Sequence, residues 1–226
     1  MAIKKRPVSP RQKMINLMYV VLMAMLALNV STEVLDGFSI VEDSLNRTTA
    51  NSSAENNAIY SDFADQMKQN PTKVREWFEK AKQVKDMSDA LYNFAQELKV
   101  AIVKEADGKD GDVSNIKNKE NLEAAGIVML APGTGKGKKL YRELNRYRER
   151  ILELVTDEHQ KKIIASNFST QVPKSEKYLG KNWQEYMFEN MPVAAAVTLL
   201  SKIQSDVRYA EGEVLHNLVA NIDMKD

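Results

Sequence analysis

The most restrictive feature of this sequence is an apolar run close to its N-terminus. Residues 14–30 read MINLMYVVLMAMLALNV and contain no charged side chain. As a helix rising 1.5 Å per residue this run would be about 25 Å long, close to the thickness of a bilayer core. We therefore predict one transmembrane helix at residues 14–30. A buried helix of a soluble domain is the alternative, because the run is short for a span.

The charges that flank the run predict its orientation. The residues before it are basic without any acid, and the residues after it are acidic until Arg47. Basic residues stay on the cytoplasmic side of a membrane, so residues 1–13 should be cytoplasmic and residues 31–226 should lie on the other side. The basic residues are Lys4, Lys5, Arg6, Arg11 and Lys13, and the acidic residues are Glu33, Asp36, Glu42 and Asp43.

A cleaved signal peptide has a similar basic start and apolar run. It would end at a small-x-small cleavage site, whereas this run ends in Ala27-Leu28-Asn29-Val30. A helical stripe of apolar residues also continues past the run, so we expect the helix to be continuous there and the anchor to be retained. The stripe consists of Val34, Leu35, Phe38, Val41 and Leu45.

The start of the predicted membrane helix is well specified. Ser9 can cap it, Pro10 suits the first helical position, and Gln12 can complete a capping box.

Polar residues gather on one side of the predicted membrane helix. At 100° per residue, Gln12, Asn16 and Tyr19 fall within about 60° of one another, and Arg11 lies about 80° from Tyr19. Polar groups at membrane depth usually face a protein partner or a water path. Snorkelling to the lipid headgroups is the alternative. We favour it for Lys13, and a partner contact for Arg11 with Tyr19.

The remainder of the chain predicts helices almost throughout. Only residues 126–130 resemble a strand, and residues 71–106 carry a strong amphipathic stripe. The predicted fold is all-α: one N-terminal transmembrane helix followed by a periplasmic helical bundle, residues 31–226. The expected helices run from the membrane to about residue 47 and over residues 51–69, 71–106, 121–130, 138–155, 157–167 and 191–222, with Thr156 as cap of the sixth and Pro192 in the first turn of the last.

Few residues suggest chemistry. The chain has no cysteine, two histidines and a net charge of +1, so we expect neither an enzyme, nor a cofactor or metal, nor a nucleic-acid partner. Residues 133–138 resemble a phosphate-binding loop, but Leu130 and Gly137 stand where that motif requires a glycine and a serine or threonine. We therefore favour a flexible basic loop. Asp107, Asp110 and Asp112 miss the calcium-loop spacing and suggest a solvated turn. His159 and His216 lack ligand partners at helical spacing, and Trp77 and Trp183 should be packing residues.

The N-terminal motif carries a resemblance to a known family. SPRQKMINLMY at residues 9–19, continued by MAMLALNVS at residues 23–31 and by Glu33-Val34, resembles the start of GldM/PorM proteins, and most of all the PorM branch. These are single-span motor subunits of the type 9 secretion and gliding machinery. Members continue into β-rich periplasmic domains, so we expect this chain to be the N-terminal portion.

The resemblance implies a specific mechanism. Two copies would place their anchor helices in a ring of GldL/PorL-type subunits in the bacterial inner membrane, and proton flow would move the pair. That motion would pass through the periplasm to further secretion components, including those of the outer membrane. Arg11 matches the arginine that pairs with a ring carboxylate, and Tyr19 matches a tyrosine beside that contact.

Two other functions are open from the residues. A passive single-span scaffold would tolerate replacement of the anchor by any span. A periplasmic sensor module with a helical interaction domain would need a cytoplasmic output domain, yet only about 13 residues precede the predicted span.

Overall fold

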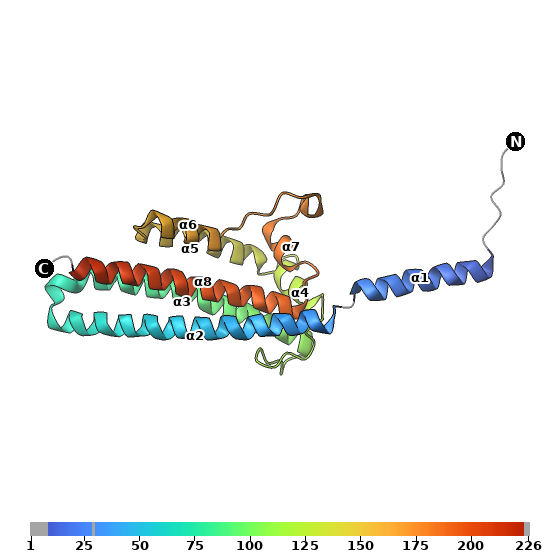
Figure 1. The fold of residues 1–226 in the computed structure, drawn as a ribbon, viewed down its shortest axis with the longest axis horizontal. Coiled ribbons are helices and arrows are strands. Elements are labelled where there is room, and N and C mark those ends of the chain that lie inside the picture. The colour runs from blue at the N-terminus through green and yellow to red at the C-terminus, as the bar shows by residue number, and fades with distance from the viewer. Residues whose placement is uncertain (1–8, 29, 224–226) are drawn as a thin grey trace.

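The computed structural model describes residues 9–28 and 30–223, and the side chains of residues 22–28 are outside the description. All regular structure in this part of the chain is helical (Figure 1). The elements are α1 (Pro10–Leu28), α2 (Thr32–Gln69), α3 (Pro71–Asp107), α4 (Ala124–Leu130), α5 (Gly137–Leu154), α6 (Glu158–Asn167), the 3-10 turn η1 (Glu176–Tyr178), α7 (Trp183–Phe188) and α8 (Val193–Asp223).

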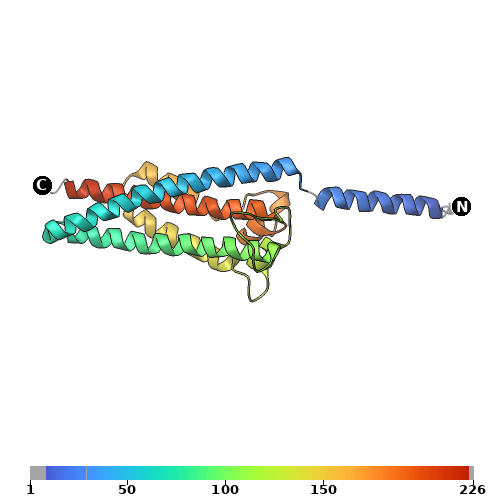
Figure 2. The same ribbon diagram turned by 90° about the horizontal axis from the view of Figure 1, so that it is seen from below.

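Three long helices form the body of the bundle. At 1.5 Å per residue, the 38 residues of α2 make a rod of about 57 Å. Asn70 joins α2 to α3, and its side chain caps α3 by accepting from the backbone N–H of Lys73 at 3.2 Å. α8 then runs in the direction of α2 and packs against both α2 and α3 (Figures 1 and 2).

α8 is the central helix and α2 a peripheral one. α8 buries residues over its whole length, including Leu200 and Leu215, which are fully inaccessible to solvent. α2 buries only Thr49, Asn56 and Phe63 among its 38 residues. Two of these three are polar, so polar contacts help to hold α2 to the bundle together with the partly buried Ile59, Tyr60 and Met67.

The shorter helices cover the other side of the α3–α8 pair. α5 turns Leu140, Leu144, Tyr147 and Ile151 inward at helical spacing, where they join the core that α3 and α8 form. α4 and α7 lie together at the end of the bundle that faces α1 (Figure 1). As predicted, Trp183 is a packing residue, with its ring 6.2 Å from that of Phe188, and Trp77 packs against the core.

Most long helices are where the periodicity predicts them, but several boundaries differ. The predicted helices ending near Arg47 and starting at Asn51 are one helix, α2, because no glycine or proline interrupts residues 47–51. The possible strand at residues 126–130 is helical, and α7 was not predicted. α6 is capped by Asp157, not by Thr156.

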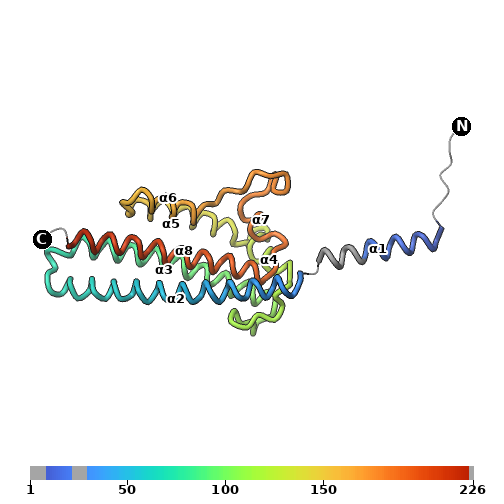
Figure 3. The backbone as a smooth tube through the Cα atoms, viewed as in Figure 1, coloured from blue at the N-terminus to red at the C-terminus, as the bar shows by residue number. Residues whose placement is uncertain are grey.

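The expected continuity between the apolar run and the next helix is also wrong. α1 ends at Leu28, and α2 begins at Thr32 with its own cap: Ser31 is extended and its hydroxyl accepts from the backbone N–H of Val34 at 3.3 Å. A helix that starts with a cap of this kind is a separate element, so α1 and α2 are two rods joined through non-helical backbone at Val30 and Ser31 (Figure 3).

The predicted span at residues 14–30 overlaps α1. Among the described residues, none of the helices combines the length and the apolar character that crossing a membrane requires. The basic residues at 4–6 and Asn29, which contributed to the prediction, lie outside the described residues. The membrane span and the division at residues 13 and 30 stay predictions.

Gly212 allows α2 and α8 to approach closely, which gives a test of the packing. An alanine Cβ there would lie 2.9 Å from the amide oxygen of Asn56, whose side chain is held by two hydrogen bonds to α8. Gly212→Ala should therefore lower the free energy of unfolding by about 1–3 kcal/mol, despite the usual gain of about 1 kcal/mol for alanine over glycine in a helix.

Gly126→Ala in α4 is the matched control, because nothing lies within 4 Å of its added Cβ. It should raise stability by up to about 1 kcal/mol in a urea titration. Equal stabilisation by both substitutions would show that Asn56 is not fixed against α8.

Candidate functional site on α1 and in the polar seam

Ser9 caps the start of α1, as the sequence predicts, and the side-chain amide of Gln12, predicted to complete a capping box, donates to Asn16. The Ser9 hydroxyl accepts from the backbone N–H of Gln12 at 3.2 Å, and the Ser9 carbonyl accepts from that of Lys13 at 3.0 Å. These bonds satisfy donors that a helix start otherwise leaves free. The first turn, which carries Arg11, is therefore a defined part of the helix.

Two of the predicted polar-face residues are brought together. The Gln12 side-chain amide donates to the Asn16 side-chain oxygen at 3.0 Å, one turn apart. Tyr19 and Arg11 are both exposed, Tyr19 by 63%. α1 contains no acidic residue, so no group of this helix can neutralise Arg11.

Most of the described apolar side chains of α1 are also exposed, and Ile15 is half-buried. Met14, Leu17, Met18 and Val20 are each 64–68% accessible to solvent. A contiguous apolar surface of this kind is characteristic of a segment that is covered by lipid or by another protein. α1 extends away from the bundle (Figures 1 and 2), so the described bundle does not cover this surface.

A buried carboxylate ties α2 to α8 in the middle of the bundle. Glu211 is 1% exposed and accepts from the Asn56 side-chain amide at 3.0 Å and from the Tyr60 hydroxyl at 2.7 Å, both on α2. Arg208, one turn earlier on α8, donates to the same carboxylate at 3.0 Å. Burial and the neighbouring Glu211 charge raise the pKa of Tyr60, so its hydroxyl stays a donor.

Arg208 carries this network on to α3. Its guanidinium donates to Asp89 at 2.9 Å and lies 4.2 Å from the centre of the Tyr92 ring. Lys85 donates to the other oxygen of Asp89 at 2.6 Å. Partial burial raises the pKa of Asp89, but the hydrogen bonds and charges of Lys85 and Arg208 outweigh it and hold that pKa below its ordinary value of 3.8.

A second polar contact joins α2 to α3 and α8 nearer to α1. Lys99, 3% exposed, lies 3.4 Å from the Glu42 carboxylate and donates to Gln204 at 3.1 Å. Burial lowers the pKa of Lys99, and the Glu42 charge partly restores it. The Ser201 hydroxyl donates to the same Glu42 oxygen at 2.7 Å, which fixes this carboxylate between the three helices. We call the contacts around Glu42 and Glu211 the polar seam.

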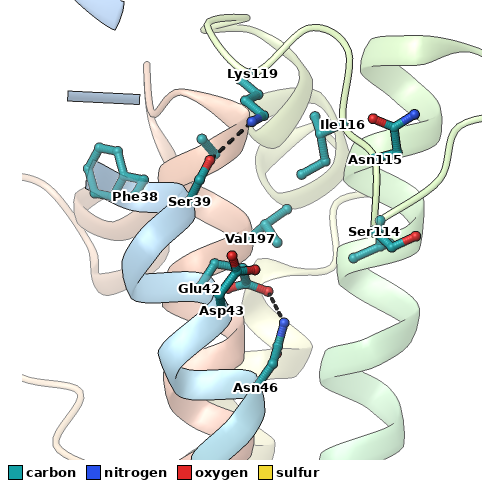
Figure 4. Close-up of a pocket in the computed structure, with 12 residues that line it drawn as sticks. Phe38, Ser39, Glu42, Asp43, Asn46, Ser114, Asn115, Ile116, Lys119 and Val197 are labelled. Atoms are coloured by element: carbon teal, nitrogen blue, oxygen red, sulfur yellow. Dashed lines mark hydrogen bonds between the residues drawn. The ribbon is translucent and has the colours of Figure 1, made fainter. Parts of the chain in front are cut away.

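A small hollow of about 290 Å³ adjoins the polar seam at the same end (Figure 4). Its wall includes Glu42, Asp43 and Asn46 of α2, and Lys119 of the α3–α4 loop donates to Ser39 at 3.1 Å across its rim. Asn46 donates to Glu42 at 3.2 Å. The other Glu42 oxygen is buried without a hydrogen-bond partner among the described residues.

The motifs considered for chemistry have structural roles. Gly135 and Gly137 of the glycine-rich loop pack closely, Gly137 against the side chain of Gln184. Asp107 accepts from the backbone N–H groups of Lys117 and Asn118 at 2.8 and 2.9 Å, so it closes the α3–α4 loop. Among the described residues, no cluster of three His, Asp or Glu side chains has a metal-binding arrangement.

The polar seam was not predicted. Arg208 and Glu211 lie within the apolar pattern of the last helix, three residues apart, and that placement was the available signal. Their α2 partners, Asn56 and Tyr60, could not be paired with them from the sequence, because the contact spans about 150 residues of chain.

Comparison with known proteins decides the family. A family model described as the GldM N-terminal domain matches residues 33–221. The chain belongs to the GldM family. The match extends from the start of α2 to near the end of α8, so it covers the bundle and shares only Glu33 and Val34 with the motif that carried the resemblance. The comparison with curated protein sequences gave no match.

Membership in the GldM family indicates that the protein is a component of the gliding and type 9 secretion machinery. In this GldM-family bundle, the matched region includes every residue of the polar seam. The seam therefore belongs to the domain by which the family is defined, and the N-terminal polar face lies outside the match.

Loss of the central carboxylate should strongly destabilise the bundle. Glu211→Ala removes the acceptor of the Asn56 amide and the Tyr60 hydroxyl and leaves the partly buried Arg208 with Asp89 as its acidic partner, which should cost about 2–4 kcal/mol. The control Glu79→Ala removes an exposed carboxylate of α3 and should change stability by less than about 0.5 kcal/mol. Chemical denaturation measures both, and equal effects would contradict the seam's role.

Acid should weaken the bundle partly through Asp89. Since its pKa in the folded protein lies below the ordinary value, Asp89 stabilises the fold at neutral pH, and this contribution is lost as the pH falls below about 4. Asp89→Asn should lower stability at pH 7 and flatten its decline between about pH 5 and 3. Thermal unfolding across this range is the measurement; parallel curves for both proteins would contradict the assignment.

Proposed function

We propose that this GldM-family chain is an inner-membrane motor subunit of the type 9 secretion and gliding machinery. Its α1 helix would couple proton flow through a ring of membrane partners to motion that the helical bundle transmits through the periplasm. The observation that carries the proposal is the separate α1 helix, whose described side chains are exposed except for the half-buried Ile15 and whose start is capped and basic.

The apolar surface of α1 supports a place in the membrane. Met14, Leu17, Met18 and Val20 would each bury most of their surface on transfer to lipid or to a partner helix. The basic residues precede this surface, and Glu33 and Asp36 follow it on α2, which favours a cytoplasmic N-terminus.

The polar face supports a protein partner within the membrane. The bond between Gln12 and Asn16 satisfies only part of their capacity, and the amides retain donors and acceptors for a neighbour. A guanidinium at membrane depth needs an acidic partner, and α1 contains no acidic residue, so the partner of Arg11 must come from outside α1.

A carboxylate of a GldL/PorL-type ring would supply that group. An isolated carboxylate in lipid is protonated, whereas one beside a guanidinium is ionised. If two α1 helices reach only some ring subunits at a time, pairing and protonation alternate around the ring. A proton crossing 100 mV releases about 2.3 kcal/mol, so a few protons suffice to exchange ion pairs of ordinary strength.

The bundle would carry the motion outward. α2 continues from the α1 end over about 57 Å, and the polar seam fixes it to α3 and α8 at Glu42 and at Glu211. A displacement of the start of α2 would therefore move the three long helices together. A homodimer, as in the proposed motor, would carry two such bundles.

Two other functions predict different behaviour. A passive scaffold would work with any span in place of α1, and a periplasmic sensor module would keep its ligand response after changes in the polar face. The exposed polar residues at the start of α1 favour the motor over both, because neither alternative needs them.

Arg11→Ala should abolish the coupling without disturbing assembly. Secretion and gliding of cells that carry the substitution in the full-length protein should fall by about tenfold or more, since loss of one ion pair of ordinary strength changes a rate by that factor. Arg11→Lys keeps the charge and should retain part of the activity. Co-purification with the ring partner should be unchanged.

Lys13→Ala is the matched control, because it removes a neighbouring charge that we assign to the headgroups. It should leave secretion close to the wild-type level. Wild-type secretion by cells that carry Arg11→Ala, with normal assembly, would contradict the ion-pair mechanism and favour the passive scaffold.

A further inference from the structure

The segment between α6 and α7 presents an unusual exposed leucine. Leu179 is 85% accessible to solvent, more than any other large apolar side chain described. It lies directly after η1 and before Gly180, whose φ of +77° turns the chain back. With 85% of its surface accessible to solvent, Leu179 adds little to the core, and its side chain is accessible to a contact outside the chain.

The turn is built rigidly. The backbone N–H of Tyr178 donates to Ser175 at 3.1 Å, and that of Lys181 donates to Tyr178 at 3.1 Å. The Tyr178 ring packs edge-on against Tyr186 with the ring centres 4.7 Å apart, and Lys181 pairs with Glu189 at 3.1 Å. Leu179 is therefore held in its exposed place, which lowers the entropic cost of a contact made there.

Basic residues flank the leucine in the sequence, and others line a hollow at the start of α7. Residues 174–181 contain three lysines, Lys174, Lys177 and Lys181, against the single acid Glu176. Residues 131–142 contain four basic side chains and no acid, and these line one hollow together with Asn182 and Gln184 at the start of α7. Glu185 and Glu189 also face that hollow, but Glu185 accepts from the backbone N–H of Asn182 and Glu189 pairs with Lys181.

The position of the turn points to the occupant. The segment between α6 and α7 loops out at the end of the bundle that faces α1 (Figures 1 and 2). If α1 spans the membrane, this end lies next to the bilayer surface. We propose that the turn around Leu179 docks on anionic phospholipid, with Leu179 in the interfacial layer and Lys174 and Lys177 against the phosphate groups; this rests on the proposed function.

Charge complementarity fixes the side of the bundle that approaches the lipid. α2 begins at the same end with Glu33 and Asp36, which an anionic surface repels. The α3–α4 loop at this end carries Lys109 and Lys117 among a larger number of acidic residues, so the basic excess lies with residues 174–181 and 131–142. Docking would thus tilt the bundle toward the side that carries these residues. Basic residues near an anionic surface each raise affinity about fivefold, so Lys174 and Lys177 act together with the leucine.

Site-directed labelling tests the docking, because the chain has no cysteine. An environment-sensitive fluorophore is attached to Leu179→Cys in the full chain, reconstituted into phosphatidylcholine vesicles with or without about one third phosphatidylglycerol. We expect a blue shift with the anionic lipid. The same probe at Lys68→Cys, an exposed side chain at the far end of α2, should report water in both.

A charge variant separates docking from the probe's own affinity for lipid. Lys174→Glu with Lys177→Glu should remove at least about half of the shift at position 179. Both lysines are exposed, so the thermal midpoint should not change. An undiminished shift in this variant would overturn the assignment of the lysines to the lipid phosphates.

A probe at Met18→Cys reports the membrane position of α1 independently. A lipid environment at 18 with water at 179 would overturn the docking and leave the proposed function standing. An aqueous environment at position 18 with a lipid environment at position 179 would overturn the proposed function and leave lipid contact of the turn standing. An aqueous environment at both positions would overturn the docking and the proposed function together. Burial of position 179 only after the ring partner is added would assign the turn to a protein contact and also overturn the docking.

Discussion

The carboxylate of Glu211 is the interaction on which the arrangement of the long helices depends. It is fully enclosed, yet it has three donors, from Asn56, Tyr60 and Arg208. A buried charge is tolerated only when its hydrogen bonds are satisfied. Any shift of α2 along α8 would break the bonds from Asn56 and Tyr60 and would cost a large part of the free energy of folding. Apolar side chains slide past one another at much lower cost. The polar seam, more than the single buried Phe63, therefore specifies where α2 lies.

The predictability of the fold varied with the kind of signal. Helices with a continuous apolar stripe, such as α3 with its starting proline, were predicted within a residue or two of their ends. α2 was divided in error, because its polar residues around Arg47 to Asn51 look like a loop, whereas Thr49 is buried and no glycine or proline interrupts the helix there. α7 is only six residues long, and its capping box at Asn182 and Glu185 is a local signal that went unused.

In the candidate site, too, contacts within one helix could be predicted, whereas contacts between helices could not. The cap at Ser9 and the pairing of Gln12 with Asn16 follow from spacing along one helix, which a sequence displays directly. The contacts of Glu42 with Lys99 and of Glu211 with Asn56 join residues far apart in the chain. Such pairs depend on which helices are neighbours and on the register in which they pack. The apolar periodicity of a single helix reveals neither its neighbours nor its register.

The spacing of the two parts of the polar seam has a mechanical consequence. Glu42 and Asn56 lie fourteen positions apart on α2, or about 21 Å along its axis. A helix attached to its neighbour at one point can pivot about that point. A helix attached at two separated points resists rotation when a sideways force acts on its end. Residues 32–37 at the start of α2 extend beyond its first polar contacts, at Phe38 and Ser39, as a short overhang. A lateral push on that overhang is thus converted into opposed forces on α8, and the bundle turns as a beam without bending at α2.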